Sequence, residues 1–404
     1  MIVSEAPLSG VTILDLTQHI AGPYCTKVLA GLGAEVIKVE KPGSGDGARR
    51  VGPFFEDDPH PEKSTLFLYL NTNKKSVTLN LKTATGAHLF KELVRQADVV
   101  VESFSPRVMS SLGLGYEALR EVKADLLMTS ISNFGQTGPY RDYFLTEISA
   151  LAVGGLLFIT GDPDREPLMI GAQLAQYITG LHASMATMMA IHHWDDKGVG
   201  QHVDVSVMES VASILDVTPM WASYMDTVRP RAGNRHTGGY PFSILFCRDG
   251  YVGIIAASPK HWETFCKSIL KRPELISDSR FASSHARLQN ADELDAIMLE
   301  WTMEHDKEEI YHMGQAAGLP FGYVATFEDI FKSPQFKFRN FFEEVDHPFV
   351  GKVIYPGRPF KMSEATWESL ARPPLLGEHN EEVYGGRLGL TKDDLVKLRE
   401  SNVI

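Results

Sequence analysis

The sequence contains few cysteines and no arrangement of them that would bind a metal. Three cysteines, Cys25, Cys247 and Cys266, are spread over 404 residues. An odd, sparse count without a C-x-x-C pair argues against a disulfide framework and against a cysteine-rich zinc site. The adjacent His192 and His193 lie about 100° apart on a predicted helix, so they cannot chelate one ion. We therefore expect a reducing compartment and no metal site.

Long apolar runs and an excess of basic residues are also absent. The longest apolar stretch, around residues 151–160, is shorter than the roughly 18 residues that span a bilayer. The segment MIVSEAPLSG lacks a basic region followed by an apolar one, so it does not resemble a signal peptide. Acidic residues outnumber basic ones by 51 to 39, a formal net charge of −12. Because nucleic-acid binding needs a basic face, we do not expect a nucleic-acid partner. Without a membrane-spanning run or a signal-peptide pattern, we expect a soluble, cytoplasmic protein that does not bind membranes.

The common nucleophile and nucleotide motifs are missing as well. There is no G-x-S-x-G elbow, and KPGSGDGARR at residues 41–50 fits neither G-x-G-x-x-G nor the P-loop pattern. This segment is either a plain surface loop or an anion contact made by backbone N–H groups. Lys74 and Lys75 form either a solvated strand edge or a phosphate contact. The residues alone allow an anionic ligand and name no reaction.

What the sequence does contain is an alternation of short apolar strands and helices. Strands are predicted at residues 11–17, 35–40, from 76, 98–103, 125–132 and 203–207, and helices at 22–33, 86–96, 171–194 and 209–225. Near-continuous apolar strands separated by helices are typical of a parallel sheet covered on both faces. We therefore predict an α/β fold with a doubly wound, Rossmann-like parallel sheet.

A change in composition at residues 228–241 predicts a domain boundary. This tract is basic, rich in glycine and turn-forming, and a β-hairpin is predicted directly after it at residues 242–257. We predict a large domain built from residues 1–227 and 329–404, with a smaller α+β domain inserted at residues 228–328.

Several long segments together resemble the class III CoA-transferase family, which includes formyl-CoA transferase, the carnitine CoA-transferase and α-methylacyl-CoA racemase. The similarity runs from about residue 8 to residue 386 and is carried by PLSGVTILDLTQHIAGPYCTKVLAGLGAEVIKVEKPGSGDGAR, LNTNKKSVTLNLKTATG, ADVVVESFSPRVMSSLGLGYEAL, SISNFGQTGPYRDY and PPLLGEH. Their number and order make the resemblance specific. It implies an acyl-CoA substrate, no metal, and two chains threaded through each other as interlocked rings.

The resemblance also implies which residues contact coenzyme A. Matched to the family's motifs, these positions are Gln18, Ala21, Lys41, Leu70, Ser103, Phe104 and Leu112. At positions that are often arginine in relatives, Lys41 keeps a cation and Ser111 does not. Because lysine lacks the bidentate fork of arginine, we expect the phosphate contacts to be weaker or differently placed.

The most informative departure from the family lies at residues 167–183, PLMIGAQLAQYITGLHA. Relatives carry an aspartate where this sequence has Gln176. In the transferases that aspartate attacks the acyl-CoA thioester, and in the racemase it moves the α-proton. A glutamine amide is a weak base without an anionic oxygen, so Gln176 is expected to be inactive in both roles. Glu147 matches an acidic position near the family's active site and is the nearest replacement nucleophile.

Four functions are compatible with this departure. We favour a subunit of a heteromeric class III CoA-transferase, such as the succinyl-CoA:benzylsuccinate enzyme, with succinyl-CoA as candidate donor and a sister subunit that supplies the aspartate. The alternatives are an active homodimeric transferase that uses an acid such as Glu147, a non-enzymatic acyl-CoA-binding protein, and an acyl-CoA racemase or lyase. Trp221, Tyr224 and Met225 either line an apolar acyl pocket or belong to the core.

Overall fold

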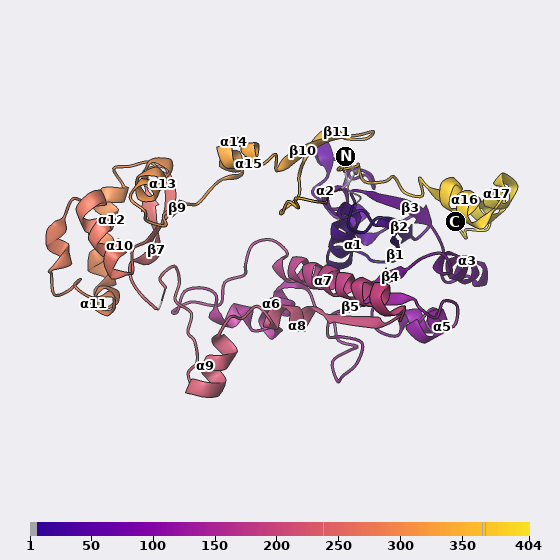
Figure 1. Ribbon diagram of the computed structural model, residues 1–404, viewed down its shortest axis with the longest axis horizontal. Helices are drawn as coiled ribbons and strands as arrows, with labels where there is room; N and C mark the ends of the chain where they lie inside the picture. The colour runs from indigo at the N-terminus through magenta and orange to yellow at the C-terminus, as the bar shows by residue number, and fades with distance from the viewer. Residues whose placement is uncertain (1–5, 237, 366, 368) are drawn as a thin grey trace. The chain divides into compact units, whose positions relative to one another are not determined.

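The computed structural model describes residues 6–236, 238–365, 367 and 369–404, which form two compact units (Figure 1). The first unit comprises Met1–Leu156, Gly171–Asp216 and Arg339–Ile404, and the second comprises Leu157–Ile170 and Val217–Phe338. These limits follow the contacts between residues and differ from the boundaries that composition suggests at residues 228 and 328. The predicted division into domains stays a prediction.

Parallel strands form the central sheet of the first unit. They are β1 (Thr12–Asp15), β2 (Glu35–Glu40), β3 (Lys74–Thr78), β4 (Val99–Glu102), β5 (Leu127–Ser132) and β6 (His202–Ser206). In the described residues the strand order is β3-β2-β1-β4-β5-β6, with each neighbouring pair parallel. This order confirms the predicted α/β fold with a Rossmann-type sheet. The chain reverses its progression between β1 and β4, which leaves a crevice at the carboxyl ends of these strands.

Helices α1 (Ala21–Gly31) and α7 (Leu174–Lys197) cover one face of this sheet. Buried residues of both helices pack against apolar side chains of β1, β4 and β5. The two helices approach closely at Gly180, where an added Cβ atom would lie 2.6 Å from the carbonyl oxygen of Ala21. The position therefore needs a residue without a side chain.

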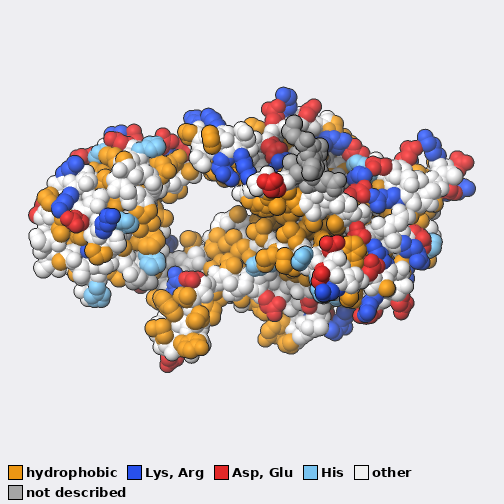
Figure 2. Space-filling view, viewed as in Figure 1, with side chains coloured by type: hydrophobic (Ala, Val, Ile, Leu, Met, Phe, Trp, Pro, Cys, Tyr) orange, Lys and Arg blue, Asp and Glu red, His pale blue; other side chains and the backbone are white. Residues whose placement is uncertain are grey.

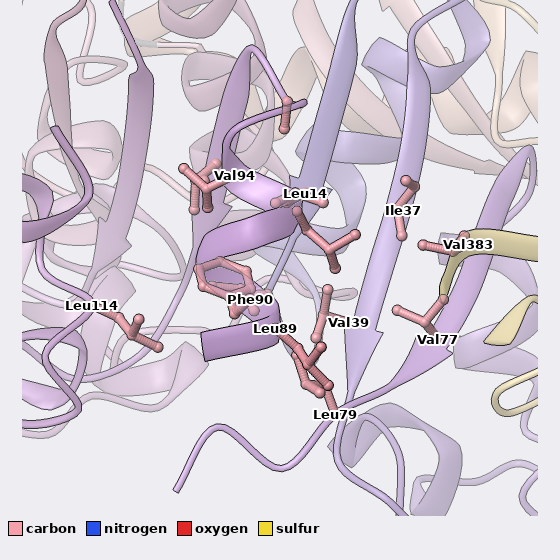
Figure 3. Packing of buried hydrophobic residues seen from close by; sticks show 14 of the residues in the cluster. Leu14, Ile37, Val39, Val77, Leu79, Leu89, Phe90, Val94, Leu114 and Val383 are labelled. Carbon is pink, nitrogen blue, oxygen red and sulfur yellow. The ribbon is translucent and has the colours of Figure 1, made fainter. Parts of the chain in front are cut away.

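The opposite face is covered by α3 (Ala84–Val94) and by the C-terminal part of the chain (Figure 3). Phe90 and Val383 belong to the same buried cluster as Leu14 and Val77. The Thr78 N–H donates to Oδ1 of Asn380 at 2.8 Å, and the Tyr384 hydroxyl donates to the Thr78 carbonyl at 2.9 Å. Residues more than 300 positions apart thus join at the edge strand β3.

The first unit contains further short elements around this core. They are η1 (Gly47–Arg50), η2 (Phe55–Asp57), α2 (Thr65–Leu70), α4 (Val108–Ser111), α5 (Tyr116–Arg120), α6 (Glu147–Val153), α8 (Val207–Ala212), β10 (Phe342–His347), β11 (Gly351–Pro356), η6 (Glu381–Gly385), α16 (Gly386–Leu388) and α17 (Lys392–Glu400). Strands β10 and β11 form an antiparallel pair.

The second unit is built on a small antiparallel sheet with helices packed against it. Its strands, β7 (Phe242–Cys247), β8 (Gly250–Ile255) and β9 (Gly322–Tyr323), form the predicted hairpin and a third strand. A separate buried cluster around Phe265, Met298 and Phe321 forms its core. The helices are α9 (Thr218–Met225), α10 (Pro259–Thr264), η4 (Phe265–Ile269), η5 (Pro273–Ile276), α11 (Ser284–Gln289), α12 (Ala291–Thr302), α13 (Lys307–Ala316), α14 (Phe327–Lys332) and α15 (Pro334–Phe338), and η3 (Leu156–Ile159) begins at the boundary of the units.

The helix predicted at residues 209–225 is broken in the structure. Helix α8 ends at Ala212, Asp216 adopts a left-handed conformation with φ of 57°, and α9 begins with Pro219 in its first turn. Proline is favoured at the start of a helix and lacks the N–H that would continue one. The helix is therefore interrupted at Asp216 and Pro219.

Most side chains of α9 are exposed, which contradicts the core interpretation of this segment and leaves the acyl-pocket interpretation a prediction. Tyr224 is 85% exposed and Met225 65% exposed, and α9 buries none of its residues. Apolar side chains gather over α9 on the surface of the second unit (Figure 2). Trp221 lies among them, 6.0 Å from the Arg229 guanidinium. An exposed apolar patch of this kind marks an interaction surface rather than a core.

Candidate functional site

A cavity of about 350 Å³ opens in the first unit at the carboxyl ends of the central strands. Its walls come from residues 18–22 after β1, 103–106 after β4 and 131–133 at the end of β5. Gln173 and Gln176 add side chains from the start of α7. The cavity therefore occupies the crevice beside the point where the strand order reverses, which is the usual ligand site of an open α/β sheet.

Four of the residues predicted to contact coenzyme A line this cavity, namely Gln18, Ala21, Ser103 and Phe104. The other three do not: Lys41 is exposed after β2, Leu70 is fully buried in α2, and Leu112 packs against the apolar core. Their contact with coenzyme A stays a prediction, as does that of the four lining residues.

Gln176 lies in the first turn of α7 and its position lines the cavity. Glu147, the first residue of α6, lies beside this turn but does not line the cavity. Its Oε1 accepts the Ala175 backbone N–H at 2.7 Å, and its Oε2 is buried without a hydrogen-bond partner in the described residues. Burial raises the pKa of Glu147, and the N–H groups of Ala175 and Gln176 oppose this rise. The structure thus places Glu147 as a helix-capping carboxylate.

One acidic residue lines the cavity in the described part of the chain, and it is paired. The carboxylate of Asp142 lies 2.6 Å from Nη2 of Arg107 and 3.6 Å from Nε of Arg141. Its side chain is about half exposed. Because both guanidinium contacts occupy the carboxylate, an attack by Asp142 on a substrate would first have to break them.

Most of the other polar groups in the wall are neutral amides and hydroxyls. Gln18, Asn133, Gln173 and Gln176 contribute amides, and the Gln18 backbone N–H donates to Oγ of Ser103 at 2.9 Å. The hydroxyl of Ser132 is buried at the end of β5 and has no hydrogen-bond partner in the residues that the structure describes. A buried unpaired hydroxyl is costly, so this hydroxyl is available for a hydrogen bond to a bound molecule or to water. The amides and hydroxyls of the lining offer hydrogen bonds to a neutral group with amide or carbonyl functions.

A buried network of charges lies beneath the turn that carries Gln18. Nζ of Lys74 lies 3.1 Å from Oδ2 of Asp15, and Nζ of Lys38 lies 2.8 Å from Oδ2 of Asp46. Lys38 also donates to the Thr17 carbonyl at 2.8 Å. The network therefore fixes the backbone between β1 and α1 from below.

The turn is also held through His19, whose backbone N–H donates to Oδ1 of Asp46 at 2.9 Å. His19 has a left-handed φ of 65°. For a residue other than glycine this conformation requires support from its surroundings. Asp46 provides that support because the same oxygen also accepts the Ala48 N–H.

The charges of the network shift one another's pKa. Burial raises the pKa of Asp15, but the nearby ammonium groups of Lys38 and Lys74 and the hydroxyls of Thr17 and Thr26 outweigh it, so the pKa falls to about 2. Burial lowers the pKa of Lys74 to about 8, although Asp15 opposes this effect. All three charged side chains are fully buried. The network is held together by ion pairing within the protein.

The predictions for the two lysines and for the glycine-rich segment are partly wrong. Lys74 is neither a solvated edge nor a phosphate contact, because it is buried against Asp15. Lys75 pairs with Glu35 at 2.7 Å and with Glu382 at 2.6 Å. In the segment 41–50, Arg49 is fully buried, and it pairs with Glu40 at 2.7 Å and with Glu62 at 2.6 Å. These cations are occupied by the protein's own carboxylates.

Glu102 supports the second wall of the cavity from the end of β4. Its Oε2 accepts the Phe104 backbone N–H at 2.7 Å, and the residue is 3% exposed. Burial raises the pKa of Glu102 to about 7, against hydrogen bonds from the Ser130 hydroxyl and the Phe104 N–H, while the charge of Asp204 adds to the rise. Its protonation therefore changes near neutral pH, next to residues that line the cavity.

Sequence reasoning missed this support structure although a signal for it was present. Asp15, Lys38 and Glu102 are charged residues within or at the end of strands that the pattern predicts to be buried. A buried charge requires a partner. The sequence shows this requirement without showing which residues meet. Ser132 gives no such signal, because serine is common at both buried and exposed positions.

The described residues contain no helix that is long and apolar enough to cross a membrane. Over the same residues, no cluster of three or more His, Cys, Asp or Glu side chains is arranged to hold a metal ion.

The fold and the cavity define a doubly wound α/β protein with a ligand site at the switch point of its sheet, extended by a second unit with an antiparallel sheet. The chain belongs to CoA-transferase family III, whose family model matches residues 8–380. This membership makes it a CoA-transferase family protein with the acyl-CoA substrates that the family implies.

Named relatives match nearly the whole chain. The human succinyl-CoA:glutarate CoA-transferase is 35% identical over 379 residues, which are 93% of this chain and 85% of the relative. The succinyl-CoA–D-citramalate CoA-transferase of Chloroflexus aurantiacus is 34% identical over 404 aligned positions, covering 98% of each chain. A solved CAIB/BAIF family protein from Brucella suis superposes with a TM-score of 0.86 at 32% identity, over 95% of this chain and 100% of that one.

Proposed function

We propose that this chain binds an acyl-CoA in the cavity of the first unit and is the subunit of a heteromeric class III CoA-transferase that lacks its own nucleophile. The observation that carries the proposal is Gln176 in the cavity wall, and the resemblance of residues 167–183 to the family matches this position to the family's aspartate. In that wall the described acid, Asp142, is already paired with Arg107. The sister subunit would supply the missing carboxylate.

Succinyl-CoA is the candidate donor. Two relatives that match nearly the whole chain carry succinyl-CoA in their names, as a partner of glutarate in one and of D-citramalate in the other. The substrates in those names differ only in the acceptor acid. A shared donor with a variable acceptor is therefore the simplest extension to this chain.

Exposed apolar surfaces support an assembly with a second, similar chain. Leu181, Met185 and Met189 follow one another at four-residue spacing on α7, and each is about half exposed. Residues at this spacing share one face of a helix. With the exposed residues of α9, they are the surfaces that the interlocked arrangement proposed for this family would cover.

The structure gives less support to Glu147 as a replacement nucleophile. Its Oε1 accepts the Ala175 N–H. Glu147 is 8% exposed and does not line the cavity. An attacking carboxylate must reach the thioester carbon, at about 3–3.5 Å. The homodimeric transferase through Glu147, the non-enzymatic binder and the racemase remain alternatives for the test below.

The test is incubation with succinyl-CoA followed by mass measurement of the intact protein. A nucleophilic carboxylate attacks the thioester carbon, CoA leaves as its thiolate, and the thiolate then attacks the resulting anhydride. The succinate is released and CoA stays on the protein as a thioester. We expect no such adduct on this chain alone, and an adduct on the sister subunit when both are produced together.

Two variants make the test specific to position 176. Gln176→Asp restores a carboxylate at the proposed nucleophile position, so a CoA adduct is expected on this chain. Gln173→Asp adds the same group at a neighbouring residue of the same cavity and should give none. A CoA adduct on the unmodified chain would refute the proposal, and loss of that adduct in Glu147→Gln would establish the homodimeric alternative.

A further inference from the structure

A second pocket, of about 440 Å³, adjoins the cavity in the first unit. The two share three residues, because His19, Ile20 and Gln173 line both of them. The turn after β1 and the start of α7 therefore form a common border. A ligand that reaches Gln176 in the cavity lies next to an opening into this second pocket.

The remaining wall of the second pocket is apolar or uncharged. Val51, Pro53, Leu66 and Tyr69 supply most of it, and none of the described residues that line it is a lysine, arginine, aspartate or glutamate. Val51 is 40% exposed, so this surface is accessible. An acyl chain placed here would lie against mostly apolar side chains.

The cations closest to this wall are already committed to other groups. The preceding residues are Arg49, which is buried in ion pairs with Glu40 and Glu62, and Arg50, whose Nη1 donates to the Ser44 carbonyl at 2.6 Å. Nζ of Lys27 donates to the Tyr69 carbonyl at 2.7 Å and lies 3.5 Å from the centre of that ring. A carboxylate entering the pocket would therefore lose water without gaining a cation.

We propose that this pocket accepts acyl groups with an uncharged aliphatic or aromatic chain, so that the acyl-CoA held by this chain is the thioester of an apolar carboxylic acid, while the succinyl-CoA donor reacts at the site of the sister subunit. The proposal rests on the proposed binding of acyl-CoA in the adjoining cavity. Apolar surface gains from transfer out of water, whereas an unpaired carboxylate pays a desolvation penalty in the same place. The second pocket thus discriminates between acyl groups by size and charge, and the adjoining cavity binds the coenzyme A part of the substrate.

Binding of a matched series of thioesters to the whole chain tests this directly. Free CoA, butyryl-CoA, hexanoyl-CoA and succinyl-CoA are titrated by calorimetry, which needs no catalytic turnover. Hexanoyl-CoA should bind about fifteenfold more tightly than butyryl-CoA, since it has two more methylenes and each buried methylene contributes about fourfold. Succinyl-CoA, which is similar in length to butyryl-CoA but carries a carboxylate, should bind at least about tenfold more weakly than butyryl-CoA.

Val51→Arg places a cation in the wall, and its matched control is Val396→Arg at an exposed position on α17 that lines neither pocket. Val51→Arg should reverse the preference in favour of succinyl-CoA, and Val396→Arg should leave it unchanged. Equal affinities for butyryl- and succinyl-CoA, or an unchanged preference in folded Val51→Arg, would overturn the inference. Failure of free CoA to bind would instead refute the proposed function.

Discussion

The carboxylate of Glu147 caps the helix that presents Gln176, because its Oε1 lies 2.7 Å from the backbone nitrogen of Ala175. The relationship joins α6 to the first turn of α7, where the N–H groups have no partner within the helix. Glu147, the alternative nucleophile considered under the proposed function, thereby has a structural role beside the cavity.

Two substitutions of Glu147 separate this structural task from catalysis. Glu147→Gln keeps a side-chain oxygen for the Ala175 N–H. Its free energy of unfolding is expected to lie within about 1 kcal/mol of that of the unmodified chain. Glu147→Ala leaves that N–H unpaired and should cost about 1–2 kcal/mol. Urea unfolding measures both. Equal stabilities of the two variants would contradict the capping role.

The ion pair between Asp15 and Lys74 should behave as a buried pair. Asp15→Asn leaves Lys74 and Lys38 without their shared anion and is expected to lower the unfolding free energy by about 3–5 kcal/mol. Lys75→Met at the partly exposed pair with Glu35 should cost at most about 1 kcal/mol. Denaturant unfolding of both variants measures the two losses of free energy. Similar losses would show that the pair between Asp15 and Lys74 contributes no more than a partly exposed one.

Glu102 should make the stability of the chain depend on pH near neutrality. Its pKa is about 7 in the folded protein and near 4.5 when unperturbed, so the folded state holds an extra proton between these values. The stabilising contribution is full below about pH 4.5 and is lost as the pH rises through 7, a change of about 3 kcal/mol. Glu102→Gln cannot titrate and should flatten this part of the profile.

Urea unfolding of the unmodified chain and of Glu102→Gln across that range provides the measurement. The two profiles should coincide below about pH 4.5, diverge between pH 4.5 and 7, and differ by the full amount above about pH 7. The other charged groups near Glu102 are Asp204 and, through Ser130, His202. They are unchanged in the variant, so parallel profiles would assign the pH dependence to them instead.

Gly180 should tolerate no side chain where α1 and α7 meet. In Gly180→Ala the new methyl group would lie 2.6 Å from the Ala21 carbonyl oxygen, so the helices must separate. We expect a loss of about 1–3 kcal/mol and weaker binding of CoA, because Ala21 and Gln176 line the cavity from these two helices. Gly386→Ala, at a helical glycine with open space around it, is the control and should be neutral or slightly stabilising.

Much of the sheet follows from the sequence, because its strands are short apolar runs with clear ends. Residues 35–40 are predicted and found as β2, and the resemblance to the family leads to Gln18, Ser103 and Gln176 in one cavity. The partners of buried charges are a different matter. Lys74 meets Asp15 only because β3 returns next to β2 and the turn after β1, and no local pattern contains that pairing.

The apolar pocket was equally hidden in the sequence. Val51 and Leu66 are unremarkable residues of loop and short helix, and they become a wall only because their segments fold beside the start of α7. Periodicity describes one segment at a time. A pocket made by four segments appears only once the chain is folded.

The return of residues 339–404 to the first unit also sets the order in which the protein can be completed during its synthesis. Val403 and Ile404 lie in the same buried cluster as Val77 and Phe90, and Asn380 and Tyr384 close the edge at Thr78. The apolar face of these early strands therefore stays uncovered until residues 380–404 have been synthesised. The second unit, whose core lies within residues 240–321, has all of its core residues earlier. During translation the apolar face of strands β1 to β3 thus stays exposed longer than the core of the second unit. We expect chaperones to bind this face of the nascent chain.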